Sequence, residues 1–186
     1  MLQPICVIQA RLNSTRLPDK ILLPLQGQSL LERAIFQAVS IYGPDNVVVA
    51  APSGDKPRFP ELPVGVFFYG GAENDLVSRF WHVARAMRAT SDSLIIRWTP
   101  DDWRKDNAQI RLATFRGLNS RIPAAISIEA FPMHLLDMWY WTKPVDDREH
   151  IGKFLSTRDA LRPIDNLPWS IDTQADYDAV VNAVGA

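Results

Sequence analysis

The stretch PICVIQ (residues 4–9), followed by ARLNSTRLPDK (residues 10–20), decides the fold. The first part is apolar and partly β-branched, which favours a short buried strand. The second part has no regular hydrophobic period, which is typical of a loop. Ligands in open parallel sheets bind beyond the carboxyl ends of the strands. This loop is therefore the first place to look for a functional site, and the loop after the strand predicted at 93–98 is the second.

Strand-like runs and helical periods alternate along the rest of the chain. Apolar residues recur at helical spacing after Ser29, the expected N-cap, until Gly43-Pro44 stops them. Further strands are predicted at 47–51, 64–69, 93–98, 124–128 and 135–141, with Gly70-Gly71 ending the second of these, and further helices at 76–87, 108–118 and 175–184.

This alternation predicts the fold class. Parallel strands need crossover connections and are buried on both faces. We therefore expect an α/β fold with a mainly parallel sheet and helices on both faces. The length of 186 residues suits one domain, which we place at 1–186, and its least regular part is 120–170.

Composition and charge exclude several classes of protein. Hydrophobic residues make up 47% of the chain and charged residues 22%, so it can bury a core and is neither disordered nor fibrous. A net charge of -1 gives no global field to hold nucleic acid or an anionic membrane. The single Cys6 forms no internal disulfide, and no apolar run is long enough to span a membrane. We expect a soluble, cytoplasmic protein.

The loop that follows the first predicted strand has the chemistry of a phosphate site. Guanidinium groups bind phosphate oxygens in pairs, lysine acts as a point charge, and hydroxyls and backbone N–H groups add donors. The loop carries Arg11, Ser14, Thr15, Arg16 and Lys20, opposed only by Asp19. A solvated basic loop is the alternative, and neither GxxxxGK[ST] nor GxGxxG is present.

The same loop carries a family resemblance. QARLNSTRLPDK (residues 9–20), continuing as ILLPLQGQSLLERAI, resembles the opening of the cytidylyltransferases that activate acidic sugars, including those that make the CMP-linked forms of 3-deoxy-manno-octulosonic and sialic acids. The most similar branch is named after spore coat polysaccharide biosynthesis protein F. Four later motifs resemble the family in order and spacing: GGAENDLVSRF (70–80), RWTPD (97–101), DREHI (147–151) and SIDT (170–173).

The resemblance implies a fold and an activity. The fold is a Rossmann-like nucleotidyltransferase of the nucleotide-diphospho-sugar transferase type. The activity is transfer of CMP from CTP to a sugar, with acidic sugars the first candidates, and release of pyrophosphate, for surface polysaccharide biosynthesis. Magnesium is the implied cofactor, and CTP and a sugar are the implied substrates. The alternatives are a non-catalytic nucleotide-binding or scaffolding relative and, more narrowly, a glycosyltransferase that uses a preformed donor.

The resemblance also implies roles for particular residues. The implied nucleotide-binding residues are Gln9, Ala10, Arg11, Ser14, Arg16, Lys20 and Arg79. The implied catalytic residues are Arg11, Arg16, Lys20 and Asp101. Asp101 and Asp172 are the implied magnesium ligands, which suits an ion that keeps several waters and takes other ligands from phosphates. From the residues alone, Asp172 is instead a helix N-cap, and Asp102 is either an extra ligand or a solvated neighbour.

Other candidates keep a second interpretation. Arg79 and Asp75 are explained equally well by a surface ion pair on a helix. Arg148 and His150 match implied substrate-binding positions but also fit a charge cluster at a helix start. Four tryptophans at predicted strand ends suit a sugar-stacking surface, the core or a dimer interface: Trp98, Trp103, Trp139 and Trp141.

The chain departs from the family in three places. Asn13 and Asp19 replace glycines of the first loop, and Pro100 precedes the implied metal aspartate. The chain is shorter than its relatives, mainly between 120 and 170, the implied sugar-binding and dimerisation region. Trp139 stands where we expect an acidic residue on a strand. A homodimer is nevertheless expected from the aromatic cluster around Trp139.

Overall fold

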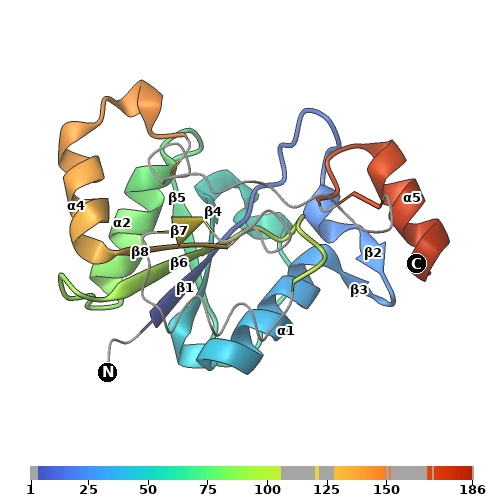
Figure 1. The fold of residues 1–186 in the computed structure, drawn as a ribbon, viewed down its shortest axis with the longest axis horizontal. Coiled ribbons are helices and arrows are strands. Elements are labelled where there is room, and N and C mark those ends of the chain that lie inside the picture. Colours follow the sequence, from blue (N-terminus) through green and yellow to red (C-terminus); the bar gives the residue numbers. More distant parts are fainter. Residues whose placement is uncertain are drawn as a thin grey trace.

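A central sheet organises the described part of the chain, with its strands in the order β5-β4-β1-β6-β8-β7 (Figure 1). The strands are β1 (Pro4–Gln9), β4 (Val47–Pro52), β5 (Phe67–Gly71), β6 (Leu94–Trp98), β7 (Ser120–Arg121) and β8 (Ile128–Pro132). The first four in this list pair in parallel, whereas β8 runs antiparallel to β6 and β7. This computed structural model describes residues 4–105, 120–121 (backbone only), 128–149, 151, 167–168 and 170–185.

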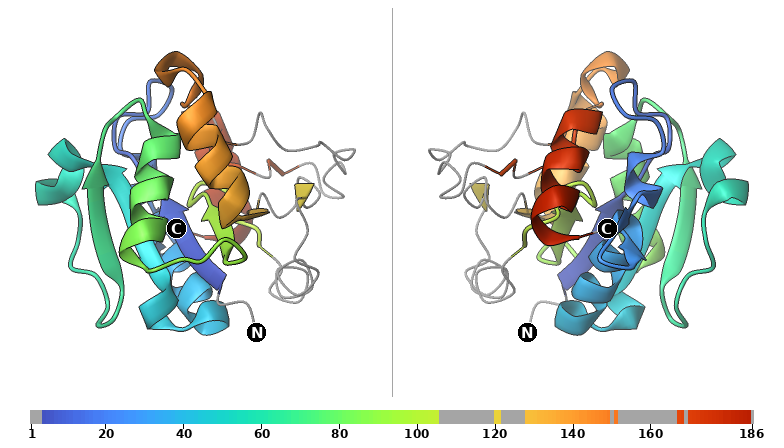
Figure 2. Two further views of the ribbon diagram at one scale, coloured as in Figure 1. Left: turned by 90° about the vertical axis from the view of Figure 1, so that its left-hand side faces the viewer. Right: turned by 90° about the vertical axis from the view of Figure 1, so that its right-hand side faces the viewer.

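Helices cover both faces of the sheet, which confirms the predicted fold class. Helix α1 (Leu30–Tyr42) packs on one face, and α2 (Leu76–Ala86) and α4 (Met133–Thr142) lie side by side on the other (Figure 2). The remaining elements are η1 (Lys20–Leu22), β2 (Pro24–Leu25), β3 (Gln28–Ser29), η2 (Pro44–Asn46), η3 (Ser53–Arg58), η4 (Val145–Asp147) and α5 (Gln174–Val184). Within the described ranges, no helix has the length and apolar character needed to cross a bilayer.

The start of α1 follows its sequence signal. Ser29 is the N-cap, and its hydroxyl accepts from the backbone N–H of Glu32 at 3.1 Å. The Glu32 carboxylate in turn accepts from the backbone N–H of Ser29 at 2.7 Å. This reciprocal capping box satisfies two donors that the first turn would otherwise leave open. The expected cap is confirmed.

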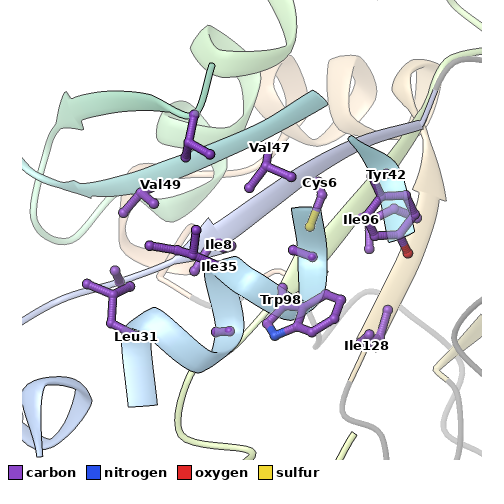
Figure 3. Packing of buried hydrophobic residues seen from close by; sticks show 14 of the residues in the cluster. Cys6, Ile8, Leu31, Ile35, Tyr42, Val47, Val49, Ile96, Trp98 and Ile128 are labelled. Carbon is purple, nitrogen blue, oxygen red and sulfur yellow. The ribbon is translucent and has the colours of Figure 1, made fainter. Parts of the chain in front are cut away.

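Strand β1 supplies side chains to both halves of the core. Cys6 and Ile8 pack with α1 (Figure 3). Ile5 and Val7 pack with α2 and α4 on the opposite face, as the twofold period of a strand requires. All four are at least 97% buried. Burial raises the pKa of the Cys6 thiol, so Cys6 behaves as a small apolar side chain.

Strand β5 differs from the prediction at both ends. Val64 is 97% exposed, and the strand begins at Phe67. Gly70 and Gly71, which we expected to end it, instead pair with Ala51 and Pro52 of β4. Gly71 is required there because a Cβ atom would lie 2.6 Å from Cγ of Arg79. The glycine pair marks a close approach of a helix to a strand rather than a turn.

The region after residue 120 corrects a second prediction. Residues 135–141, predicted as a strand, belong to α4, and Trp139 is 3% exposed in the core beside Phe131. The preceding strand is β8, which carries the acidic residue Glu129. The strand predicted at 124–128 overlaps β8 only at Ile128. The helix predicted at 108–118 lies outside the described residues.

The C-terminal segment returns to the loop that follows β1. Helix α5 and Ile171 form a small core with Leu17 and the β2–β3 hairpin, at the right of Figure 1. The Tyr177 hydroxyl donates to the carbonyl of Pro24 at 2.7 Å. The backbone N–H of Ile171 donates to the carbonyl of Asp101 at 3.0 Å. These contacts bring residue 172 next to the ends of β1 and β6.

Gly71→Ala tests the close approach between β5 and α2. We expect it to lower the free energy of unfolding by about 1–3 kcal/mol, because Arg79 Cγ lies near the helix backbone and cannot swing aside. Gly54→Ala is the matched control, since nothing lies within 4 Å of a Cβ there. Urea unfolding of both variants measures the difference. Equal stability of the two variants would contradict this account of Gly71.

Candidate functional site

The loop after β1 is tethered to the body of the protein. Leu12 and Leu17 are buried, and the backbone N–H of Leu12 donates at 2.9 Å to the buried carboxylate of Asp55 in η3. Asp19 N–H donates to the Leu12 carbonyl at 3.0 Å, which closes the loop on itself. The loop therefore presents its polar side chains from a fixed backbone. Nothing in the sequence around Asp55 indicated this role.

Asp19 tolerates the backbone conformation that a glycine would take. Its φ of 55° lies in the left-handed region, which aspartate enters more easily than most residues. Its carboxylate pairs with the guanidinium of Arg58 at 2.5 Å. The negative charge of Asp19 is thus balanced by Arg58 of η3.

Lys20 lies between two aspartates from distant parts of the chain. Its ammonium donates to the carboxylate of Asp101, which follows β6, and at 2.8 Å to Oδ1 of Asp172, which precedes α5. The Lys20 side chain is 12% exposed. Burial alone would lower the pKa of Lys20, but the two carboxylates outweigh this effect and raise it. Lys20 is therefore firmly charged.

Arg16 adds a second cation at the same place. Its Nη2 lies 2.9 Å from Oδ1 of Asp172, and its side chain is 63% exposed. The structure thus brings together four of the predicted residues: Arg16, Lys20, Asp101 and Asp172. Such an exposed ion pair contributes little to stability, so Arg16 is available to other partners.

Asp172 is not the helix cap that the residues alone suggested. The N-cap of α5 is Thr173, whose hydroxyl accepts from the N–H of Asp176 at 3.2 Å. Asp176 completes a capping box by accepting from the N–H of Thr173 at 2.8 Å. The Asp172 side chain points instead to Lys20. Threonine and aspartate three residues apart carried the signal for this cap.

The two aspartates fit a divalent cation. Both carboxylates contact the Lys20 ammonium, which takes the position between them that a divalent cation would occupy. No group of three or more potential metal-binding side chains occurs in the part of the chain that the structure describes. Magnesium tolerates so few protein ligands because it retains water and binds phosphate oxygens.

Asp102 has another role. It is neither a solvated neighbour nor directed at Lys20. Its carboxylate accepts from the hydroxyl of Thr99 and lies 3.6 Å from Nζ of Lys105. Lys105 is buried over the ring of Trp98, and this burial lowers its pKa. Asp102 thus compensates the charge of the buried Lys105.

Arg79 is a buried cation rather than half of a surface ion pair. It is 2% exposed, and its Nε and Nη1 have no hydrogen-bond partner among the described residues. Burial lowers its pKa to about 10, and the positive charge of Arg11 adds to this effect. Unpaired buried donors are costly. They are explained most simply by an anionic ligand.

Asp75 pairs with Arg148 instead of Arg79. The Asp75 carboxylate caps α2 by accepting from the N–H of Ser78 at 2.8 Å, and it lies 3.4 Å from Nη1 of Arg148. Arg148 also donates to the carbonyls of Lys143 and Tyr140. The predicted substrate residue Arg148 is thus engaged in holding α4 and η4 to α2. Its partner in that prediction, His150, lies outside the described residues.

The other loop residues take varied positions. The Ala10 N–H continues the sheet by donating to the Ala50 carbonyl at 3.0 Å, and Ser14 is half-buried. Arg11 Nη1 lies 3.6 Å from Oε1 of Glu149, and both side chains are largely exposed. None of these contacts joins the three residues to Lys20, Asp101 or Asp172, and their roles as ligand contacts stay predictions.

Gln9 belongs to a polar chain that the sequence did not reveal. Its Oε1 accepts from Nε of Arg97 at 2.6 Å, and Nη1 of Arg97 lies 3.0 Å from Oε2 of Glu129. Glu129 is 2% exposed. The chain crosses β1, β6 and β8, so only the strand order could have brought its members together.

This fold and site define the class of protein. A solved cytidylyltransferase from Leptospira borgpetersenii serovar Hardjo-bovis (strain JB197) shares the fold, with a TM-score of 0.74 and 24% identity over 95% of this chain and 84% of that one. A CMP:2-keto-3-deoxy-manno-octonic acid synthetase complexed with CTP has a TM-score of 0.64 and 16% identity, over 97% and 98% of the chains. Rv0371c from Mycobacterium tuberculosis H37Rv, solved in complex with manganese, has a TM-score of 0.67 and 17% identity, over 98% of this chain and 100% of that one. The fold is that of the nucleotidyltransferases.

The sequence profile of the cytidylyltransferase family matches residues 5–102, which is more than half of the chain. The protein therefore belongs to the cytidylyltransferase family, as the motifs indicated. Spore coat polysaccharide biosynthesis protein SpsF of Bacillus subtilis (strain 168) is 32% identical over 103 residues. That match covers 52% of this chain but only 42% of SpsF.

Thr173→Ala and Asp172→Asn separate the cap from the site. We expect Thr173→Ala to lower the free energy of unfolding by about 1 kcal/mol, the usual cost of losing a cap. Asp172→Asn should cost less than half as much, because Lys20 keeps Asp101 and the capping box is untouched. Urea unfolding of both variants provides the comparison. A larger loss in Asp172→Asn would mean that this carboxylate is chiefly structural.

Proposed function

We propose that this protein is a magnesium-dependent cytidylyltransferase that transfers CMP from CTP to a sugar, with acidic sugars the first candidates, and releases pyrophosphate. The observation that carries the proposal is the convergence of Lys20 and Arg16 on Asp101 and Asp172 at the carboxyl ends of β1 and β6. Membership of the cytidylyltransferase family supports the choice of CTP. The match to SpsF supports a role in surface polysaccharide biosynthesis, which we propose takes place in the cytoplasm.

Nucleotidyl transfer makes a particular demand on the site. An oxygen of the sugar attacks the α-phosphorus of CTP, and the bond from that phosphorus to the bridging oxygen of pyrophosphate breaks. Negative charge grows on the leaving group, so cations must lie beside it. Arg16 and Lys20 meet this demand from the tethered loop. The two carboxylates raise the pKa of Lys20 against the effect of burial, and phosphate oxygens in their place would also favour its charged form, so Lys20 would act as a fixed charge.

The ion pairs of the site suggest how a triphosphate would bind. In the structure, Arg16 and Lys20 are neutralised by Asp101 and Asp172. Phosphate oxygens would replace those carboxylates as partners of the two cations. Asp101 and Asp172 would then hold Mg²⁺. When bound, this ion supplies Lewis-acid stabilisation of phosphate charge.

Arg79 completes the cationic environment. Among the described residues its Nε and Nη1 are buried without hydrogen-bond partners, and the charge of Arg11, the first cation of the loop, acts on it. A guanidinium removed from water binds an oxyanion strongly, because its charge is poorly screened. We assign Arg11 and Arg79 to the nucleotide, in line with the sequence prediction.

Pyrophosphate release tests the proposed reaction. The full-length protein is incubated with CTP, Mg²⁺ and a panel of acidic and neutral sugars, with UTP as the control nucleotide. We expect release that depends on the sugar and on CTP, and a loss of at least about a hundredfold in Asp101→Asn. A parent that binds CTP in titrations but releases no pyrophosphate with any sugar would instead be a non-catalytic relative.

Lys20→Met tests whether the Lys20 ammonium and a divalent cation compete for Asp101 and Asp172. Removing the ammonium leaves Asp101 without its counterion and Asp172 with only the exposed Arg16, so Mn²⁺ used as a probe should bind the nucleotide-free variant about tenfold more tightly than the parent. CTP affinity should fall by about tenfold or more, since a charge-assisted phosphate contact is lost. Arg58→Met, which removes a cation from Asp19 instead, is the control. Unchanged Mn²⁺ affinity in Lys20→Met would contradict a shared site.

Self-association stays a prediction, and the structure narrows the surface that it would use. Trp139 is in the core, and Tyr140 stacks on Trp81 at 4.3 Å between ring centroids. Trp141 is 73% exposed and Met138 is 47% exposed on the same helix. Of the predicted aromatic cluster, Trp141 is therefore the side chain available to a second copy.

A further inference from the structure

The polar chain formed by Gln9, Arg97 and Glu129 has no explanation in packing alone. All three lie on the face of the sheet that α2 and α4 cover, in line with Val7, Ile95 and Phe131 of their own strands. Apolar residues fill that face elsewhere. The chain ends at Gln9, the last residue of β1, directly before the loop that carries Arg11, Arg16 and Lys20.

Arg97 fixes which way the Gln9 amide points. A guanidinium has only donors, so the atom of Gln9 that lies 2.6 Å from Arg97 Nε has to be the carbonyl oxygen. The NH2 group of Gln9 therefore faces away from Arg97. Within the described residues, this NH2 group has no hydrogen-bond partner, and Gln9 is only half-buried. It offers two oriented donors at the carboxyl edge of β1.

Glu129 in turn fixes Arg97. Its carboxylate is almost fully buried and lies 3.0 Å from Nη1 of Arg97. A buried carboxylate is kept only where it is paired, because removing its charge from water is costly. The contact at Oε2 is one of charge and proximity rather than a well-directed hydrogen bond, and it keeps the guanidinium between β1 and β8 with its Nε directed at Gln9. Each member thus restricts the next.

We propose that Arg97 and Glu129 are positioning residues that hold the Gln9 amide as a hydrogen-bond donor toward an acceptor oxygen of the bound nucleotide. This inference rests on the proposed function for the identity of the ligand. Gln9 makes the contact, and Arg97 and Glu129 act through it. A glutamine free to rotate would present its oxygen as well as its NH2 group, would repel an acceptor whenever the oxygen faced it, and would also have to be ordered on binding.

Three variants and one pair test this arrangement by titration with CTP and, separately, with pyrophosphate. Gln9→Met removes the donors and should weaken CTP binding by about tenfold, the effect of one good hydrogen bond. Arg97→Gln has both donors and acceptors, so it keeps a partner for Glu129 but lets Gln9 rotate, and it should weaken CTP binding by about threefold. Arg97→Lys keeps a charged donor and should stay within about twofold of the parent. The pair Gln9→Met with Arg97→Gln should bind CTP no more weakly than Gln9→Met alone.

The outcomes are distinct. Loss of CTP affinity without loss of pyrophosphate affinity places the acceptor oxygen on the nucleoside or α-phosphate, and loss of both places it on the terminal phosphates; each supports the proposal.

A parent that binds CTP while Gln9→Met binds it equally well overturns the proposal and leaves the proposed function standing. Additive losses in the pair also overturn it, because Arg97 would then act on the ligand directly. A parent that does not bind CTP overturns the proposed function and, with it, the ligand assigned to Gln9. The contact between Gln9 and Arg97 is still tested then, by the coupling of the two substitutions in urea unfolding.

Discussion

The ammonium of Lys20, held between the carboxylates of Asp101 and Asp172, is the interaction on which the rest of the site depends. It joins the loop after β1, the end of β6 and the segment before α5. Each of these is separately secured: the loop by Asp55, and the C-terminal segment by the Ile171 hydrogen bond to Asp101 and by the small core around Leu17. The backbone thus brings the Lys20 ammonium close to the two carboxylates, and the pairing of these charges completes the site.

Much of this fold could be predicted because its signals are local. The β-branched run of β1, the capping box of α1 and the amphipathic period of α2 each lie within a few residues. The prediction went wrong where a short apolar segment has no decisive period. In α4 the run LLDMWYW satisfies a strand and a helix about equally, and packing of Trp139 beside Phe131 and of Tyr140 on Trp81 decides for the helix. The Gly70-Gly71 pair was wrongly interpreted as a turn. Gly71 is needed because Arg79 of α2 approaches the strand too closely for a Cβ atom.

The site, like the fold, has residues that could be predicted from the sequence and residues that could not. The loop motif and the two aspartates were predictable from the family pattern, and the structure brings Arg16, Lys20, Asp101 and Asp172 into contact. The residues that support them were not predictable. Asp55, Arg97 and Glu129 act across strands that are adjacent only in the folded sheet, and their partners lie 43, 88 and 32 residues away in sequence. Thr173 was overlooked because the neighbouring aspartate is an equally good cap by type.

The distance along the chain between Lys20 and Asp172, 152 residues, has a consequence for how the site comes into being. Loop-closure entropy makes such a contact one of the last to be gained during folding, after the sheet and its helices have supplied the surface on which the segment docks. A chain that has formed β1, β4 and β6 but has not docked α5 therefore has the phosphate loop without the second carboxylate. The pair of carboxylates is therefore complete only once the C-terminal segment has docked, and a cation that needs both carboxylates would bind only the fully docked fold.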